Sequence, residues 1–219
     1  MNVLKADARG VLLLRDGLRA VLEGLRLPRK NEDGAFQMRQ ALSGMVAGKH
    51  ATLAIPPPRE DRHGRLRAQV FVNGEWVQET LLREGLARVE LLPSHPQCAK
   101  EMYAAESAAR AAKRGLWASV EYAVRSPDEL AHTRGTFQIV EGLVVSAAVK
   151  SGRAYLNFSD DWKHDFTATI SPEDMKTFRK AKVDPRDYAG KIIRVRGIID
   201  WYRGPEIELM GPESVEVVK

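Results

Sequence analysis

The stretch from the Asp61-Arg62-His63-Gly64-Arg65 turn to the Asn73-Gly74 dipeptide constrains the fold more than any other part of the chain. Residues 66–72, between the two, are rich in apolar side chains and predict a strand. Asn-Gly is typical of a two-residue hairpin because both residues tolerate a positive φ. Trp76 then begins the return strand. We therefore expect an antiparallel sheet of short strands joined by tight turns.

The rest of the first part predicts more strands, with helices between them. The Arg15-Asp16-Gly17 turn separates two short apolar runs, and Gly48 and Gly115 each follow a run with helical spacing. The further strands are expected at residues 11–14, 20–22 and 50–55. The helices are expected at residues 35–47, 80–84 and 97–114.

The second part predicts mainly strands. The strands are expected at residues 137–149, 153–158, 166–170, 191–200 and 207–210. A helix over 172–182 begins at Ser171-Pro172-Glu173-Asp174, which supplies a cap, a first-turn proline and acids. Three strands, a helix and two strands is the order of a five-stranded barrel of the OB type.

The predicted fold class is therefore mainly β with α, with two OB-fold-type domains. The first domain spans residues 1–118, a connector spans 119–135, and an OB-like barrel spans 136–219. Ser126-Pro127 and weak periodicity mark the connector, which carries at most one helical turn.

Charge and composition narrow the classes of function. The formal net charge is +5, and the basic excess lies in the first 125 residues, which could attract a polyanion; a solvated charged face is the commoner explanation. The single Cys98 excludes an internal disulfide. We find no membrane-spanning segment and no visible leader, so we expect a soluble protein. It would be cytoplasmic if the sequence is full length, and exported or periplasmic if a leader was removed.

Three motifs in a fixed order carry a resemblance. They are the Asp61-Arg62-His63-Gly64-Arg65 turn, Leu82-Arg83-Glu84-Gly85-Leu86-Ala87, and Ala111-Ala112-Lys113-Arg114-Gly115-Leu116-Trp117. Residues 8–118 thereby resemble the staphylococcal-nuclease-like (thermonuclease) family. The resemblance implies a five-stranded OB barrel with helices packed on it. It also implies calcium-assisted cleavage of phosphodiesters, in which two Asp residues hold the metal, a Glu acts on the attacking water, and two Arg residues neutralise the phosphate.

The residues of this chain depart from that pattern. The family's first metal motif falls on Ala8-Arg9-Gly10-Val11, and its strand arginine falls on Val21. The second metal Asp becomes Arg26 and the Glu becomes Arg29. Of these functional side chains the resemblance leaves only the arginine of the glycine turn, as Arg65.

An arginine at a cation site repels the ion by roughly several kcal/mol in a partly shielded pocket. We therefore predict a pseudonuclease that has lost its calcium site and uses no cofactor. If the barrel is that of the family, a set of basic residues rings the old cleft and could hold a phosphate: Arg26, Arg29, Lys30, Arg62 and Arg65. Neutral drift on a structural domain is the alternative.

The second part resembles, more loosely, a barrel that follows such nuclease domains in some bacterial proteins. Trp162 and Trp201 are its candidates for stacking on bases, as in OB barrels that bind single strands. The alternative is that they plug the ends of the barrel.

Three functions follow from this reading. The first is a catalytically inactive module that binds nucleic acid or another polyanion. The second is a scaffold that docks another protein. The third is a residual metal-dependent phosphodiesterase or nuclease, in which His63 could be a general base, although an exposed turn histidine is the simpler reading. The sequence predicts no oligomeric state.

Overall fold

The computed structural model describes residues 1–96, 98–161 and 165–218. The chain divides into two compact units, Met1–Tyr122 and Ala123–Lys219, and each has its own hydrophobic core. The division falls within residues 119–135; the domain limits 1–118 and 136–219 remain predictions. None of the helices in the described part of the chain has the length and apolar character needed to cross a membrane.

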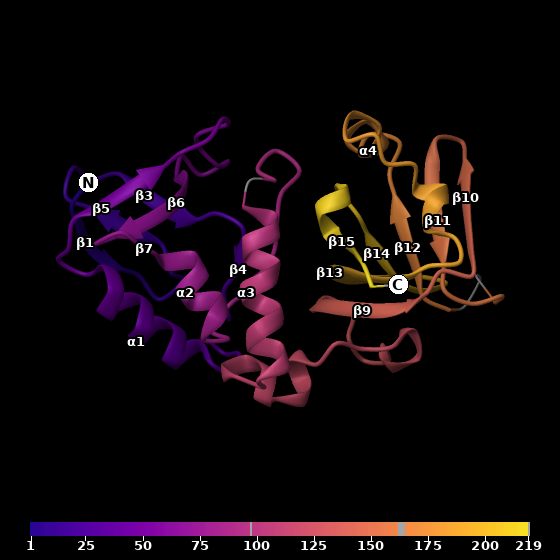
Figure 1. Ribbon diagram of the computed structural model, residues 1–219, viewed down its shortest axis with the longest axis horizontal. Coiled ribbons are helices and arrows are strands. Elements are labelled where there is room, and N and C mark those ends of the chain that lie inside the picture. Colours follow the sequence, from indigo (N-terminus) through magenta and orange to yellow (C-terminus); the bar gives the residue numbers. More distant parts are fainter. Residues whose placement is uncertain (97, 162–164, 219) are drawn as a thin grey trace. The chain divides into compact units, whose positions relative to one another are not determined.

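The first unit is built on a curled sheet whose strands pair in the order β1-β2-β3-β6-β5, with β7 also paired to β6 (Figure 1). A separate short pair joins β4 to β8. The strands are β1 Val3–Ala6, β2 Leu12–Leu14, β3 Arg19–Leu22, β4 Leu25–Arg26, β5 Ala51–Ala54, β6 Leu66–Val72, β7 Glu75–Trp76 and β8 Arg88–Val89. The expected strands at 11–14, 20–22, 50–55 and 66–72 are confirmed.

Turn chemistry explains the hairpins of this sheet. Between β2 and β3, Asp16 Oδ1 accepts the Leu18 N–H at 3.1 Å, and Gly17 has a φ of +86°. Between β6 and β7, Asn73 and Gly74 have φ values of +53° and +84°, which confirms the predicted hairpin.

The third and fourth strands of this curled sheet run parallel. β3 pairs in parallel with β6, whereas every other pairing in this sheet is antiparallel among the described residues. At the two edges of the sheet, an antiparallel β-bridge between Asn2 and His50 brings the residue before β1 to the residue before β5. The strands therefore form a half-barrel that encloses one core.

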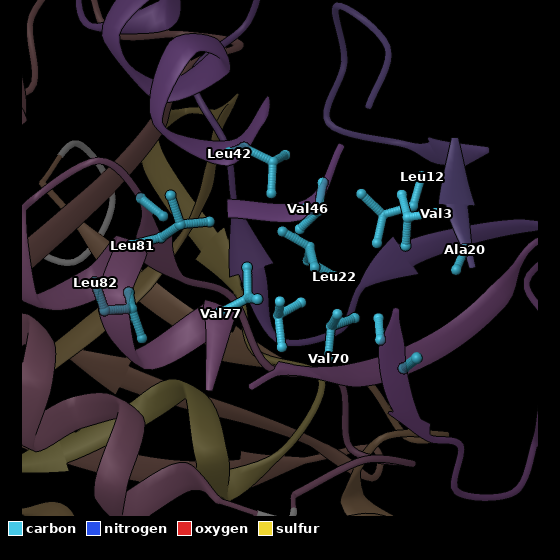
Figure 2. Packing of buried hydrophobic residues seen from close by; sticks show 14 of the residues in the cluster. Val3, Leu12, Ala20, Leu22, Leu42, Val46, Val70, Val77, Leu81 and Leu82 are labelled. Carbon is cyan, nitrogen blue, oxygen red and sulfur yellow. The ribbon is translucent and has the colours of Figure 1, made fainter. Parts of the chain in front are cut away.

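Among its described residues, the first unit has the α-helices α1 Ala35–Val46, α2 Val77–Arg83 and α3 Ala99–Ala111. The buried face of α1 carries Ala35, Met38, Leu42 and Val46 at helical spacing. Figure 2 shows Leu42 and Val46 above the side chains of Leu22, Val70 and Val77, with Leu81 and Leu82 of α2 beside them. The helix expected at 80–84 begins earlier than predicted, at Val77.

The second unit repeats the same pairing scheme. Its sheet runs β10-β11-β12-β14-β13-β15, and β9 also pairs with β13. The parallel pair is β12 with β14. The strands are β9 Phe137–Leu143, β10 Ser146–Lys150, β11 Arg153–Asn157, β12 Thr167–Ile170, β13 Ile192–Tyr202, β14 Gly204–Glu208 and β15 Val215–Val217. The strand expected over 137–149 is therefore two strands.

One helix, α4 Met175–Lys180, lies between β12 and β13 in the chain and buries Met175 and Phe178. It begins later than predicted, at Met175, after a turn in which Ser171 Oγ accepts the Asp174 N–H at 3.0 Å. In the core, Phe158 packs against Phe166 with ring centroids 4.9 Å apart. The fold class, mainly β with helices and two curled half-barrel sheets, is confirmed.

Candidate functional site

The first unit has a pocket of about 570 Å³ at one end of its sheet. Its walls are the turn between β1 and β2, the segment from β3 through β4 to Arg29, the turn before β6, and the segment that follows β8. Gly10 and Gly24 shape two of these walls, with φ values of +77° and +85°. A Cβ on Gly10 would lie 2.2 Å from Leu27 Cδ1, so glycine allows the first turn to approach β4 closely.

Arginines dominate the polar lining of the pocket. Among the described residues, the lining arginines are Arg9, Arg26, Arg29, Arg65 and Arg67. They outnumber the lining carboxylates, which are Glu23, Asp61 and Glu90. The pocket therefore has a net positive charge and is suited to an anion.

Each of these carboxylates faces an arginine of the same pocket. Arg67 Nη1 lies 2.9 Å from Glu23 Oε2, and Arg65 Nη2 lies 2.6 Å from Asp61 Oδ2. The third pair is longer, with 3.5 Å between Arg26 Nη1 and Glu90 Oε1. Arg29 has a more distant partner outside the pocket, Glu32, at 3.8 Å.

The turn before β6 is organised by Asp61. Its Oδ1 accepts the N–H groups of His63 and Arg65 at 2.8 and 3.1 Å, and its Oδ2 accepts Arg65 Nε at 2.7 Å. Burial alone would raise the pKa of Asp61, but the hydrogen bonds from Arg65 and His63 outweigh it and lower the pKa to about 2. Asp61 is thus a fixed anion that aims the Arg65 guanidinium into the pocket.

A buried charged group forms the back of the pocket. Glu23 follows β3 directly, and its side chain is only 3% exposed. Besides Arg67, it faces the imidazole of His95, with 3.8 Å between Nδ1 and Oε1. His95 Nε2 lies 3.1 Å from the carbonyl oxygen of Pro58, and its Nδ1 lies 2.9 Å from Ser94 Oγ.

The structure brings together three of the basic residues proposed from the sequence. Arg26, Arg29 and Arg65 line the pocket, whereas Lys30 and Arg62 are exposed and are not among its lining residues. Trp201 belongs to the second unit, on β13, and is 39% exposed. Whether it stacks on bases or covers a barrel end stays a prediction. Trp162 lies outside the described residues.

The sequence-based candidate list omitted Arg9, Arg67 and Glu23. Arg67 is two residues after Arg65, and in an extended chain such residues lie on the same side, so that spacing was a usable signal for Arg67. Nothing local marks Glu23, because its position beside Arg67 depends on the parallel pairing of β3 with β6. His63 is exposed in the turn, where its Nε2 lies 3.2 Å from Arg62 Nε, and it does not line the pocket.

Within the described residues, no group of three His, Cys, Asp or Glu side chains is arranged to hold a metal ion. Tyr122 and Arg88 are not among the residues that line the pocket: Arg88 packs over the Tyr122 ring, 4.8 Å from its centroid. Burial lowers the pKa of Arg88 to about 10.

A half-barrel of this connectivity, with helices packed on it, belongs to the class of OB-type domains. Residues 21–119 match the model of the staphylococcal nuclease homologue family. The chain thus contains a domain of the staphylococcal nuclease-like family.

Three relatives illustrate the similarity. A probable staphylococcal-like nuclease of Oryza sativa subsp. japonica is 32% identical over 52% of this chain and 33% of its own length. An endonuclease of Bacillus subtilis is 40% identical over 29% of this chain and 31% of its own length. An uncharacterized endonuclease of Escherichia coli is 29% identical over 55% of this chain and 76% of its own length. The chain therefore spans a third or less of the first two.

Proposed function

We propose that the first unit binds the phosphate backbone of a nucleic acid, or another polyanion, without cutting it. The observation that carries this proposal is that Arg26, Arg29 and Arg65 line the same pocket. The guanidinium group suits phosphate because its planar fork donates two parallel hydrogen bonds to phosphate oxygens and stays charged at all relevant pH values.

The family's chemistry requires a hard cation, and the residues present do not fit one. Calcium takes six to eight oxygen ligands. In this pocket the positions that carry metal Asp residues in the family are Gly10 and Arg26, and Glu23, Asp61 and Glu90 each face an arginine. A divalent ion would have to displace an arginine from each carboxylate and sit beside Arg26. We therefore assign no hydrolytic step to this site.

The second unit supplies a further contact in this proposal. Trp201 is exposed at the end of β13 and could stack on a base, and the neighbouring Tyr202 is 71% exposed. Base stacking on aromatic side chains tolerates any sequence and adds about 1–3 kcal/mol per base. Trp162 remains a candidate for the same role.

Binding of a fluorescent single-stranded oligonucleotide to the full chain, at low and moderate salt, tests the proposal. The affinity should fall as salt rises, because each neutralised phosphate releases counterions. Arg26→Glu and Arg65→Glu should each weaken binding at least about tenfold, since charge reversal turns attraction into repulsion. Arg15→Glu, on an exposed turn outside the pocket, is the matched control. Absence of binding at low salt would rule the proposal out.

A residual hydrolase is the second candidate, because relatives of this domain are named as nucleases. It would reveal itself as calcium-dependent cleavage of single-stranded DNA that disappears with Arg65→Ala. A protein-docking role would instead leave a partner bound to the Arg26→Glu, Arg65→Glu double variant.

A further inference from the structure

Arg67 lies where the sheet can offer a second guanidinium to the pocket. In the parallel pairing of β3 with β6 it stands directly opposite Val21, and both residues line the pocket. Arg65 lies two residues earlier, on the same side of the chain. Arg65, in the turn before β6, and Arg67, on β6, therefore approach the same pocket.

The two arginines are restrained differently. Arg65 is held by Asp61 within its own turn, so its direction is set locally. Arg67 is held by Glu23, which lies on the neighbouring segment and is buried. The Arg67 side chain is 23% exposed and lines the pocket, and the hydrogen bond to Glu23 uses its Nη1. A ligand that binds Arg67 must compete with Glu23.

Besides Arg67, Glu23 has His95 as a neighbour, and a histidine can change its charge. The side chain of His95 is 1% exposed and directs Nδ1 toward Glu23 Oε1 at 3.8 Å. The Pro58 carbonyl oxygen can only accept, so Nε2 must be the protonated nitrogen of the neutral ring. In that state Nδ1 accepts from the Ser94 hydroxyl. A second proton would go to Nδ1 and would place a cation beside Glu23.

We propose that Arg67 is a proton-linked anion-binding residue, controlled by the buried pair of Glu23 and His95. With His95 neutral, Glu23 retains Arg67. With His95 protonated, Glu23 shares its charge with the imidazolium, and Arg67 is released to the anion. This inference rests on the proposed function and names the group that regulates it. Of the other charged groups that line the pocket, Asp61 pairs with Arg65 and Glu90 pairs with Arg26, while Arg9 and Arg29 add positive charge; the carboxylate beside the His95 ring is that of Glu23.

The test measures the affinity of the full chain for a labelled oligothymidylate at fixed ionic strength, between about pH 8 and about pH 5.5, the range in which histidine changes charge. Phosphodiesters keep their charge over this range, so the ligand itself does not titrate. The wild-type protein should bind more tightly as the pH falls, by up to about tenfold. His95→Gln should bind with an affinity that does not change with pH. His63→Gln, which removes an exposed histidine near the pocket, is the control and should keep the wild-type profile.

Two further variants have opposite expected signs. Arg67→Gln should weaken binding about tenfold. Glu23→Gln should strengthen it severalfold at high pH and abolish the pH dependence, because a neutral amide oxygen competes for Arg67 less strongly than a carboxylate does. Glu60→Gln, which removes the same charge from an exposed residue near the turn, should change affinity far less. Thermal unfolding of each variant reports folding separately.

Several outcomes would overturn the inference. A purely structural pair would make Glu23→Gln and Arg67→Gln weaken binding together. Arg67→Gln with wild-type affinity, beside a weakened Arg65→Gln, would remove Arg67 and leave the proposed function standing. If His63→Gln lost the pH dependence of binding, that dependence would be due to His63 and not to His95. No binding by any form of the protein would instead remove the proposed function itself.

Discussion

Gly85 and Gly115 meet through their backbones. The Leu116 N–H donates to the Gly85 carbonyl at 2.8 Å. A Cβ on Gly85 would lie 2.2 Å from the Arg114 carbonyl oxygen, and one on Gly115 would lie 2.4 Å from the Gly85 carbonyl oxygen. Both glycines have a positive φ, of +66° and +53°. The glycines of two sequence motifs are thus required by one close contact between the ends of α2 and α3.

Gly85→Ala should destabilise the first unit by about 3 kcal/mol or more. The added methyl group meets backbone atoms that cannot rotate away, and the positive φ adds about 1–2 kcal/mol. Gly48→Ala is the control, because Gly48 also has a positive φ, of +71°, but has open space around its Cβ position. Urea unfolding followed on the amide NMR signals of β6 measures both. Equal losses for the two variants would show that backbone strain alone accounts for Gly85.

Asp61→Asn should lower the stability of the first unit by roughly 2 kcal/mol at neutral pH, because it removes the charge that Arg65 neutralises. The pKa of Asp61 in the folded protein, about 2, lies below the ordinary value of 3.8 for an aspartate. A carboxyl group whose pKa is lowered by folding stabilises the folded protein at pH values above its pKa in the unfolded chain. This contribution is lost as the pH falls through its pKa in the folded protein. The difference between wild type and variant should therefore shrink between about pH 4 and about pH 2.

The same urea titration, repeated across that pH range, checks the prediction. Asp16→Asn serves as the comparison, because Asp16 caps an exposed turn and forms no ion pair among the described residues. A pH-independent difference for Asp61→Asn would mean that its hydrogen-bonding geometry, and not its charge, stabilises the turn.

Gln78→Leu should destabilise the first unit by about 2 kcal/mol. Gln78 is fully buried; its Oε1 accepts the Val70 N–H at 3.1 Å, and its Nε2 donates to the Ala68 carbonyl at 2.8 Å. Leucine fills a similar volume but leaves the Val70 N–H without this acceptor, and an orphaned buried donor costs about 1–3 kcal/mol. Hydrogen exchange at Val70 should accelerate more than exchange at Phe71. Unchanged protection at Val70 would contradict the assignment.

In the second unit, Glu216→Gln should lower the free energy of unfolding more than Glu141→Gln does. Glu216 pairs with both Arg194 and Arg196, whereas Glu141 pairs with Arg194 alone. We expect losses of about 2 and about 1 kcal/mol, because Arg194 keeps Glu216 when Glu141 is neutral. The amide signals of β13 during urea unfolding report the two values. The reverse order would show that Arg194 relies mainly on Glu141.

Features set by neighbouring residues were predictable from the sequence. The turns at Asp16-Gly17 and Asn73-Gly74 and the apolar face of α1 depend on local geometry, and the structure confirms them. The start of α2 was misplaced because Val77 favours strands by its own propensity, although its side chain is buried as the first residue of a helix. The strand Val3–Ala6 was missed because four residues with one lysine carry little pattern.

The candidate site was only partly predictable for a related reason. Arg26, Arg29 and Arg65 could be proposed because they occupy motif positions of the family. The partnership of Glu23 with Arg67 joins residues 44 positions apart, and the register of a parallel pair cannot be read from either segment alone. His95 approaches from a third segment and has no local signature.

The parallel pairing of β3 with β6 also bears on how the pocket comes into being. Strands joined by short turns can pair early. β3 and β6 can pair only after the segment between them, which contains α1 and β5, has folded back. Contacts of such long sequence separation are expected to be slow to form. Until the contacts between β3 and β6 form, Val21 and Arg67 are not brought together and the pocket is incomplete. We therefore expect anion affinity to appear late during refolding, when the pairing of β3 with β6 completes the half-barrel.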